Sequence, residues 1–279
     1  MERAFDLRLL FLVLAGGGTE HLRDEAAQRE TWAGDDSDRH SVIWLRAGER
    51  NRFDHESRTL YVPSNEGELL KKTVLAVDWA LENMEFDAIV RTNVSSFFVI
   101  DTLIGKLYMR HFNSNSFGGH LHYKKSPRTD STGNFFISGT GIFLGKNAAR
   151  LLSKIPLKEY ESIPDDIAIT EYLNDFLDLN IVSIPRLSLS NHHFFFTSCF
   201  IRCKSSWNNS LASKRMRLLN SYFSVEGRLE KTLLVLRIYF FELKSSRFSL
   251  FAPLQYLNRI RVEIKEFVLN KKYSKSTSY

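Results

Sequence analysis

The chain has 279 residues, of which 43% are hydrophobic and 25% are charged, values close to the average for soluble globular proteins. Wholesale disorder, a collagen-like repeat and a disulfide scaffold are therefore excluded, and the two cysteines are expected to be reduced thiols in the cytoplasm. The net charge of +6 is compatible with phosphate-bearing ligands but is too small to predict nucleic-acid binding.

Hydrophobic patterns predict strands that alternate with helices. The uninterrupted apolar run at residues 9–15 predicts a strand buried on both faces, which is typical of a parallel sheet. The other predicted strands are 41–45, 86–91, 135–137, 141–144 and 180–184. The predicted helices are 24–32, 68–82, 97–107, 146–153 and 165–176. Alternation of this kind predicts an α/β fold with a mostly parallel sheet flanked by helices.

Beyond about residue 210 the pattern changes, and basic amphipathic stretches predominate. We therefore expect an α/β domain over residues 1–215 and a helical C-terminal extension over 216–279. Residues 257–269 are interpreted either as an element that covers the sheet or forms an oligomer contact, or as a helix on an anionic membrane surface. The apolar runs at 9–15 and 233–241 are shorter than the roughly 20 residues that cross a bilayer, so no transmembrane anchor is expected.

Glycines and arginines follow the first predicted strand. Gly16-Gly17-Gly18 fails the dinucleotide-binding pattern, because His21 stands where its last glycine is needed, and a turn is favoured. Such a strand end is nevertheless where open α/β sheets bind ligands. Arg23, and Arg29 in the segment Arg29-Glu30-Thr31-Trp32, are two arginines six residues apart. They are equally compatible with binding a diphosphate and with a surface helix that buries Trp32.

Three polar segments are candidate parts of a site. The run from Arg91 to Ser96 follows a predicted strand, where it suits either a ligand or an N-cap. Residues 138–141 suit a plain turn, or a close approach of the backbone to a ligand. Of Asp165 and Asp166, one is interpreted as a helix cap, whereas the second is either a solvated charge or a general base in a cleft.

Metal-ligand patterns are weak. His192 and His193 are adjacent, so at most one of them readily joins a given site, and a packed histidine is favoured over a metal ligand. Cys199 and Cys203 lack the second pair of ligands that a zinc site needs.

Taken in chain order, five segments resemble the β-1,3-galactosyltransferase and Fringe-like group of inverting GT-A glycosyltransferases. They are Arg29-Glu30-Thr31-Trp32, Lys72-Thr73 with Trp79, Arg91 to Val99, Ser138-Gly139-Thr140-Gly141-Ile142, and Asp165-Asp166-Ile167. The third segment also looks like that of soluble glycosyltransferases from large DNA viruses and bacteria.

One departure from this group concerns the metal. Asn93-Val94-Ser95 stands where the group has the D-x-D carboxylates that bind a divalent metal, and amide or hydroxyl oxygens are weaker ligands. Either a manganese or magnesium ion is held elsewhere, or arginine and lysine neutralise the diphosphate, or the chain is inactive. The candidate metal ligands, if such an ion binds, are Asn93 and His193.

The resemblance implies a GT-A-like hexosyl- or pentosyltransferase. It would move galactose, N-acetylhexosamine or xylose from a nucleotide-sugar donor, UDP-linked, to a glycan or glycoprotein hydroxyl with inversion. Asp166 would be the catalytic base. The implied donor-binding residues are Arg29, Arg91, Asn93 and Ser95, and the implied acceptor or pocket residues are Trp32, Ser138, Gly139, Thr140, Gly141 and Asp165.

The alternative is a catalytically inactive binding or scaffold protein with the same fold. For either function we expect a cytoplasmic protein, in the host cytoplasm if viral. Any peripheral contact with a membrane would be made by the extension, residues 216–279. No nucleic-acid partner is expected.

Overall fold

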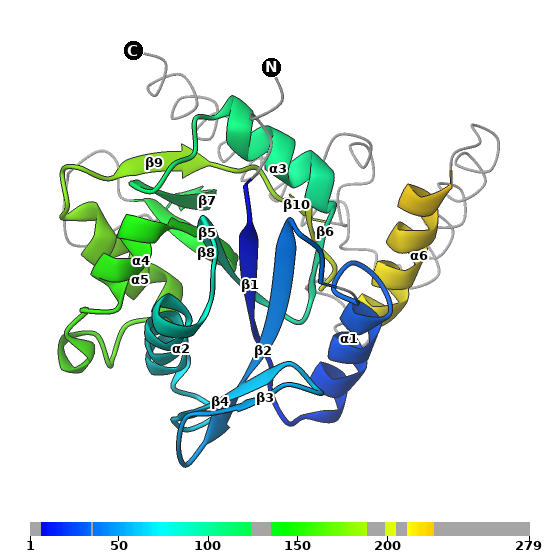
Figure 1. Cartoon of the computed structure of the whole chain (residues 1–279), viewed down its shortest axis with the longest axis horizontal. Helices are drawn as coiled ribbons and strands as arrows, with labels where there is room; N and C mark the ends of the chain where they lie inside the picture. The colour runs from blue at the N-terminus through cyan, green and yellow to red at the C-terminus, as the bar shows by residue number, and fades with distance from the viewer. Residues whose placement is uncertain (1–6, 35, 124–134, 189–198, 205–210, 226–279) are drawn as a thin grey trace, which may run out of the picture.

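The computed structural model describes residues 7–34, 36–123, 135–188, 199–204 and 211–225 (Figure 1). The strands are β1 (Leu9–Leu14), β2 (His40–Gly48), β3 (Arg52–Asp54), β4 (Thr59–Pro63), β5 (Ala88–Asn93), β6 (Ser96–Phe98), β7 (Ser116–Tyr123), β8 (Phe135–Gly145), β9 (Asn180–Ser183), β10 (Leu187–Ser188) and β11 (Phe200–Arg202). The helices are α1 (Thr19–Arg29), α2 (Leu69–Asn83), α3 (Ile100–Met109), α4 (Lys146–Leu152), the 3-10 turn η1 (Leu157–Glu159), α5 (Asp165–Asn174) and α6 (Ala212–Ser224).

An eight-stranded sheet forms the centre of the molecule, in the order β3-β4-β2-β1-β5-β8-β7-β9. Strand β1 runs parallel to both β2 and β5, and the pairs β2–β4 and β7–β9 are also parallel. Strand β8 is antiparallel to β5 and β7, and β3 is antiparallel to β4. The predicted α/β class is confirmed, with a sheet that is parallel around β1 and mixed beyond β5.

Both faces of β1 are buried, as its uninterrupted apolar sequence predicts. Alternate side chains point to opposite faces, so Leu9, Phe11 and Val13 enter one apolar cluster while Leu10 and Leu12 enter the other. The first cluster lies under α3 and α6, and the second lies under α2, α4 and α5. The helices therefore cover both faces of the sheet (Figure 1).

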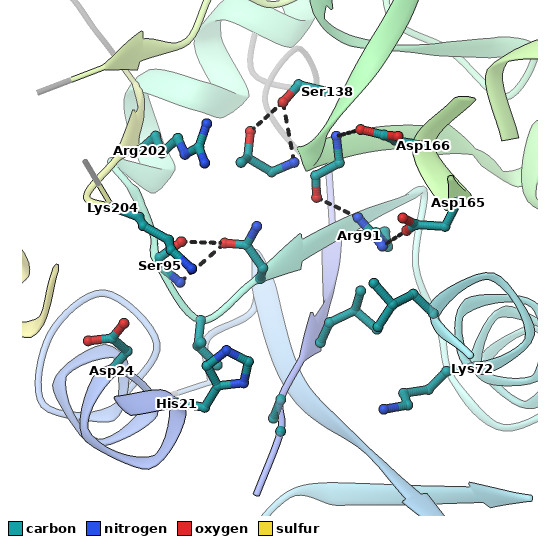
Figure 2. A pocket seen from close by; sticks show the side chains of 18 of the residues that line it. His21, Asp24, Lys72, Arg91, Ser95, Ser138, Asp165, Asp166, Arg202 and Lys204 are labelled. Atoms are coloured by element: carbon teal, nitrogen blue, oxygen red, sulfur yellow. Dashed lines mark hydrogen bonds and ion pairs between the residues drawn. The ribbon is translucent and has the colours of Figure 1, made fainter. Parts of the chain in front are cut away.

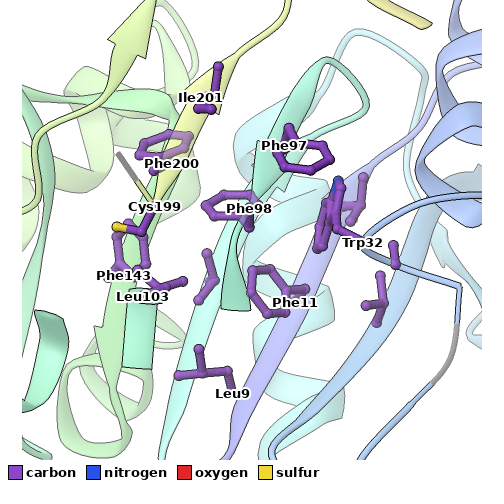
Figure 3. Close-up of a cluster of buried hydrophobic side chains, with 14 of the residues drawn as sticks. Leu9, Phe11, Trp32, Phe97, Phe98, Leu103, Phe143, Cys199, Phe200 and Ile201 are labelled. Atoms are coloured by element: carbon purple, nitrogen blue, oxygen red, sulfur yellow. The ribbon is translucent and has the colours of Figure 1, made fainter. Parts of the chain in front are cut away.

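A second, three-stranded sheet has the order β10-β11-β6. It extends the first apolar cluster, in which the rings of Phe98 and Phe200 are stacked with their centroids 4.8 Å apart (Figure 3). Strand β11 runs antiparallel to β6, so a segment near residue 200 lies beside a turn near residue 95. This pairing carries residues from distant parts of the chain to the same end of β5.

Helix α6 lies beside α1 (Figure 1), and an ion pair joins Arg217 to Glu30. The predicted boundary at 215/216 falls inside this helix, whose Ala212, Met216 and Leu219 belong to the same apolar cluster as β1. Residues 226–279, including the stretches 233–241 and 257–269, lie outside the described ranges, so the division into two domains stays a prediction. Within those ranges no helix has both the length and the apolar character to cross a membrane.

Several predicted element bounds were wrong. Helix α1 begins at Thr19 and ends before Trp32, whereas 24–32 was expected. Residues 135–137 and 141–144 form one continuous strand, β8, with no turn between them. Residues 97–98 belong to β6, and α3 begins only at Ile100. Strands β3, β4 and β7 were not predicted; β7 contains two glycines and two histidines, which weaken the strand signal.

Candidate functional site

A cavity of about 430 Å³ lies at the carboxyl ends of β1 and β5 (Figure 2). The first turns of α1 and α5 line it, and so do β8 and the segment that follows β11. The predicted site residues that line it are Arg91, Asn93, Ser95, Ser138, Gly139, Thr140, Asp165 and Asp166. These eight residues come from three distant segments, because neighbouring strand ends meet at one edge of a sheet.

Hydrogen bonds to the Asn93 side chain organise the polar turn at the end of β5, which comprises residues 93–96. The Asn93 Oδ1 accepts from the Ser95 backbone N–H at 3.2 Å and the Ser95 hydroxyl at 2.8 Å. The Ser96 hydroxyl lies 3.2 Å from the same oxygen, but its single proton has a closer acceptor, the Thr140 carbonyl at 2.9 Å. Since the carbonyl oxygen is used within the turn, the amide NH₂ is the group that Asn93 can offer to a ligand. The turn therefore supports hydrogen-bond donation from Asn93.

Arg91 is only 2% exposed and holds the cavity wall together. Its guanidinium forms an ion pair with Asp165, and its Nη1 donates to the Gly139 carbonyl at 2.5 Å. Burial lowers the pKa of Arg91 to about 10, which the nearby charge of Asp166 opposes, so Arg91 stays protonated at neutral pH. A phosphate that bound Arg91, as the sequence predicted, would therefore have to share its guanidinium with Asp165 and the Gly139 carbonyl.

Asp166 lies in the first turn of α5, next to Asp165 but with different partners. Its Oδ2 accepts from the Gly139 backbone N–H at 3.1 Å, and its Oδ1 accepts from its neighbour Ile167 at 3.0 Å. The N-cap position of α5 is Pro164, so the expected aspartate cap was wrong. A Cβ at Gly139 would lie 2.8 Å from Arg91 Nη1 and 3.2 Å from Asp166 Cβ, so only glycine lets both side chains approach β8.

The hydroxyls of Ser138 and Thr140 lie 2.9 Å apart on β8 and are both nearly buried. Arg186 Nη1 donates to Ser138 Oγ at 2.7 Å and to Thr140 Oγ1 at 2.9 Å. On the same side of the cavity, the rings of His122 and Phe136 stack with centroids 5.2 Å apart. This side combines an ordered polar network with an aromatic surface.

Arg29 does not line the cavity. Its guanidinium lies 3.5 Å from the centroid of the Trp44 ring, bonds Glu25 at 2.8 Å and donates to the Ser57 carbonyl at 2.8 Å. These contacts give Arg29 a structural role at the end of α1, away from its expected place beside the donor.

Trp32 is also placed in the core rather than in the cavity. Its indole N–H donates to the Ser96 carbonyl at 3.0 Å, and its ring packs against Phe11 and Phe98 with centroids 5.0 Å away (Figure 3). Gln28 Nε2 donates to the same carbonyl at 3.0 Å. Trp32 and Gln28 therefore support the Asn93–Ser96 turn from behind.

Gly141 faces the core as well. A Cβ at this position would lie 2.5 Å and 2.7 Å from carbons of the buried Phe200 ring. Gly141→Ala is therefore expected to lower the free energy of unfolding by about 1–3 kcal/mol, the usual cost of overpacking. Gly67→Ala is the matched control, because a Cβ there meets no atom within 4 Å. Thermal unfolding followed by circular dichroism measures both, and equal midpoints would contradict this role.

Several residues of the cavity were not predicted from the sequence. Lys72 of α2 is 1% exposed, and its Nζ lies 3.3 Å from Glu66 Oε2. A lysine on the apolar face of a helix was the available signal. Other charged or aromatic lining residues that were missed are Glu20, His21 and Asp24 of α1, Glu66, His122 of β7, Phe136 of β8, and Arg202 and Lys204 at the end of β11. His193 lies outside the described residues.

Asp24 is 7% exposed and accepts a hydrogen bond from the Ser213 backbone N–H at the start of α6. Burial raises its pKa to about 6; the hydrogen bond to Ser213 and the charges of Arg23 and Lys204 oppose this rise, while Glu20 adds to it. The folded protein thus binds the Asp24 proton more tightly than the unfolded chain does.

Stability should therefore depend on pH through Asp24. Because its pKa rises from about 3.9 in the unfolded chain, its contribution is present below pH 4 and is lost as pH rises through about 6. Relative to the wild type, Asp24→Asn should raise the melting temperature at pH 7.5 but not at pH 4. Asp78→Asn, at an exposed helix position, is the control. A difference that is equal at both pH values would contradict the raised pKa.

The residues of the polar turn do not fit a divalent metal. Asn93 Oδ1 already accepts two hydrogen bonds, from the backbone N–H and the hydroxyl of Ser95. Across the described part of the chain, no three His, Cys, Asp or Glu side chains gather in a group suited to a metal ion. The manganese or magnesium expected from the resemblance stays a prediction.

Comparison with protein-family models finds no match, and neither does comparison with curated proteins. Among solved structures, a glycosyltransferase involved in the glycosylation of the major capsid of PBCV-1 has a TM-score of 0.42 at 9% identity, over 76% of this chain and 99% of that one. The apo-form glycosyltransferase GlyE of Streptococcus pneumoniae TIGR4 has a TM-score of 0.42 at 9% identity, over 84% of this chain and 63% of that one. A second GlyE structure has a TM-score of 0.39 at 12% identity, over 78% and 64%. All three TM-scores are below 0.5.

Proposed function

We propose that the chain is a glycosyltransferase that moves a sugar from a nucleotide-sugar donor, UDP-linked, to a glycan hydroxyl with inversion. The observation that carries the proposal is Asp166, a carboxylate held in the cavity by the Gly139 N–H while its neighbour Asp165 pairs with Arg91. The cavity volume of about 430 Å³ is within the range of small-molecule sites.

In the proposed reaction, the acceptor hydroxyl oxygen attacks the anomeric carbon of the donor sugar. The new carbon–oxygen bond forms on the face opposite the leaving diphosphate, while the bond from the anomeric carbon to the phosphate oxygen breaks. Asp166 takes the hydroxyl proton, and the single displacement inverts the anomeric centre. The Gly139 N–H orients the Asp166 carboxylate for this transfer.

The acceptor is proposed to bind beside β7 and β8. The stacked rings of His122 and Phe136 offer an apolar surface to a sugar ring, next to the hydroxyls of Ser138 and Thr140. Asn93 and Ser95 also line the cavity, and the donor is proposed to lie beside them.

A donor-hydrolysis screen tests the proposal. UDP-galactose, UDP-N-acetylglucosamine, UDP-xylose and GDP- and dTDP-linked sugars are incubated with the full chain, with and without Mn²⁺, and the released nucleotide is measured. We expect slow hydrolysis of at least one donor, which an added glycan acceptor accelerates. Hydrolysis of none, together with no binding of any nucleoside diphosphate, would contradict it.

A catalytically inactive scaffold protein is the second candidate function. The observation that favours it is Asn93-Val94-Ser95 at the place of the metal-binding carboxylates. It predicts donor binding with neither hydrolysis nor transfer in the same screen. A cytoplasmic location, and contact of residues 216–279 with a membrane, are proposals under either function.

A further inference from the structure

Strand β11 places two cations against the polar turn after β5. Arg202 is paired with Ser96 in the antiparallel ladder, and the Cys203 N–H donates to the Ser95 carbonyl at 2.8 Å. Alternate side chains of an extended segment share a side, so Arg202 and Lys204 both line the cavity, whereas Cys203 between them is fully buried. Figure 2 shows both cations on the side of the cavity that holds Ser95.

Helix α6 fixes the backbone between these cations. Arg215 is only 3% exposed, and its Nη1 donates to the Cys203 carbonyl at 2.9 Å. The N–H and the carbonyl of Cys203 are thus both bound, one to the β5 turn and the other to α6. The positions of Arg202 and Lys204 therefore depend on Arg215, which does not itself line the cavity.

Two further cations, Arg91 and Lys72, line the cavity. Arg91 is paired with Asp165, and Lys72 with Glu66. Asp24 lies near enough to Lys204 for the lysine charge to lower its pKa, against the larger effect of burial. The Arg202 and Lys204 side is thus the part of the cavity that combines two cations with the Asn93 turn.

We infer that Arg202 and Lys204 neutralise the donor diphosphate at the place where a divalent metal would otherwise lie, with Arg215 as a positioning residue. This inference rests on the proposed function. A guanidinium donates two parallel hydrogen bonds to a phosphate, and a lysine ammonium adds a compact charge. Asn93 supports this arrangement because its amide NH₂ is a donor to phosphate oxygens.

Titration calorimetry with inorganic pyrophosphate and with UDP, on the full chain in EDTA, tests the inference. We expect the wild type to bind both probes without metal. Arg202→Gln and Lys204→Gln should each weaken binding about tenfold, and the double variant about a hundredfold, as is usual for hydrogen bonds to charged groups. Lys214→Gln, on the exposed face of α6, is the matched control and should bind as the wild type does.

Arg215 is tested by its effect at a distance. Arg215→Met should weaken pyrophosphate binding severalfold, and Arg215→Lys, which keeps a donor, should recover part of the loss. Thermal unfolding of each variant is recorded first, and titrations are made well below its midpoint. A merely structural role would lower the unfolding midpoint and leave the pyrophosphate affinity of the folded protein unchanged.

The outcomes separate the inference from the proposed function. Binding of UDP that requires Mn²⁺ would overturn the inference and leave the glycosyltransferase proposal standing. Wild-type affinity in the double variant would do the same. Absence of UDP, GDP, dTDP and pyrophosphate binding in both EDTA and Mn²⁺ would overturn both. Asp24→Asn adds a check. If a metal held by the Asp24 carboxylate binds the diphosphate, the variant should lose UDP binding. If Arg202 and Lys204 bind the diphosphate, the variant should bind UDP in EDTA with equal or tighter affinity.

Discussion

Asp166→Asn is expected to reduce turnover of the best donor and acceptor pair by about 10²–10⁴-fold, the range of general acid–base contributions. The amide of asparagine keeps an oxygen that can accept the Gly139 N–H, so the side chain should stay in place. It cannot take a proton from the acceptor hydroxyl at neutral pH. Steady-state transfer rates and UDP affinity, measured on the same preparation, distinguish lost chemistry from lost binding.

Asp175→Asn, at the exposed C-terminal end of the same helix, is the matched control and should retain wild-type turnover. UDP affinity of the Asp166 variant should stay within about threefold of the wild type, since its carboxylate is assigned to the acceptor proton and not to the donor diphosphate. Retention of more than about a tenth of the wild-type turnover would remove Asp166 from the role of base, given the usual size of this contribution.

The parts of the site that the sequence predicted are those with a local signal. Asn93 and Ser95 follow a buried strand, and Asp165 and Asp166 open a helix. Parallel strands end at one edge, so polar residues at their ends come together whatever their separation in the chain. Such residues can be predicted without knowing which strands are paired, and the structure brings them to one cavity.

The part that was missed depends on pairing between distant segments. Arg202 and Lys204 reach the cavity only because β11 pairs with β6, more than 100 residues earlier. Neither strand has a local sequence pattern that indicates which strand it pairs with, and each is only three residues long. The antiparallel strand β8 was divided wrongly for a related reason. Its glycines suggest a turn, whereas Gly139 and Gly141 admit neighbouring side chains to a continuous strand.

The segment Arg29-Glu30-Thr31-Trp32 shows that a motif can match while its residues lie away from the cavity. Arg29 covers Trp44, and Trp32 holds the carbonyl of Ser96. Trp32 therefore supports the turn that carries Asn93, whereas the contacts of Arg29 lie at the end of α1. A resemblance locates such a segment but does not say which of its side chains face the ligand.

Arg91→Met is expected to lower the free energy of unfolding by about 3 kcal/mol, because loss of one partner leaves the other charge of a buried pair uncompensated. Asp165 is 15% exposed and would lose its ion pair, while the Gly139 carbonyl and the Thr73 hydroxyl would lose a donor. Urea unfolding at pH 7.5 measures the change. A loss of less than about 1 kcal/mol would show that water replaces these bonds cheaply, as at exposed pairs.

The double variant Arg91→Met, Asp165→Asn separates the two roles considered for Arg91. It removes the unpaired carboxylate, so it should regain part of the lost stability. If Arg91 only holds the wall, UDP affinity should recover in parallel with stability, because Arg91 lies on the same strand, β5, as the proposed donor residue Asn93. If Arg91 binds the diphosphate itself, as the sequence predicted, affinity should stay low although stability is regained. The structural role is favoured because a single guanidinium already bonds Asp165, Gly139 and Thr73 inside the protein.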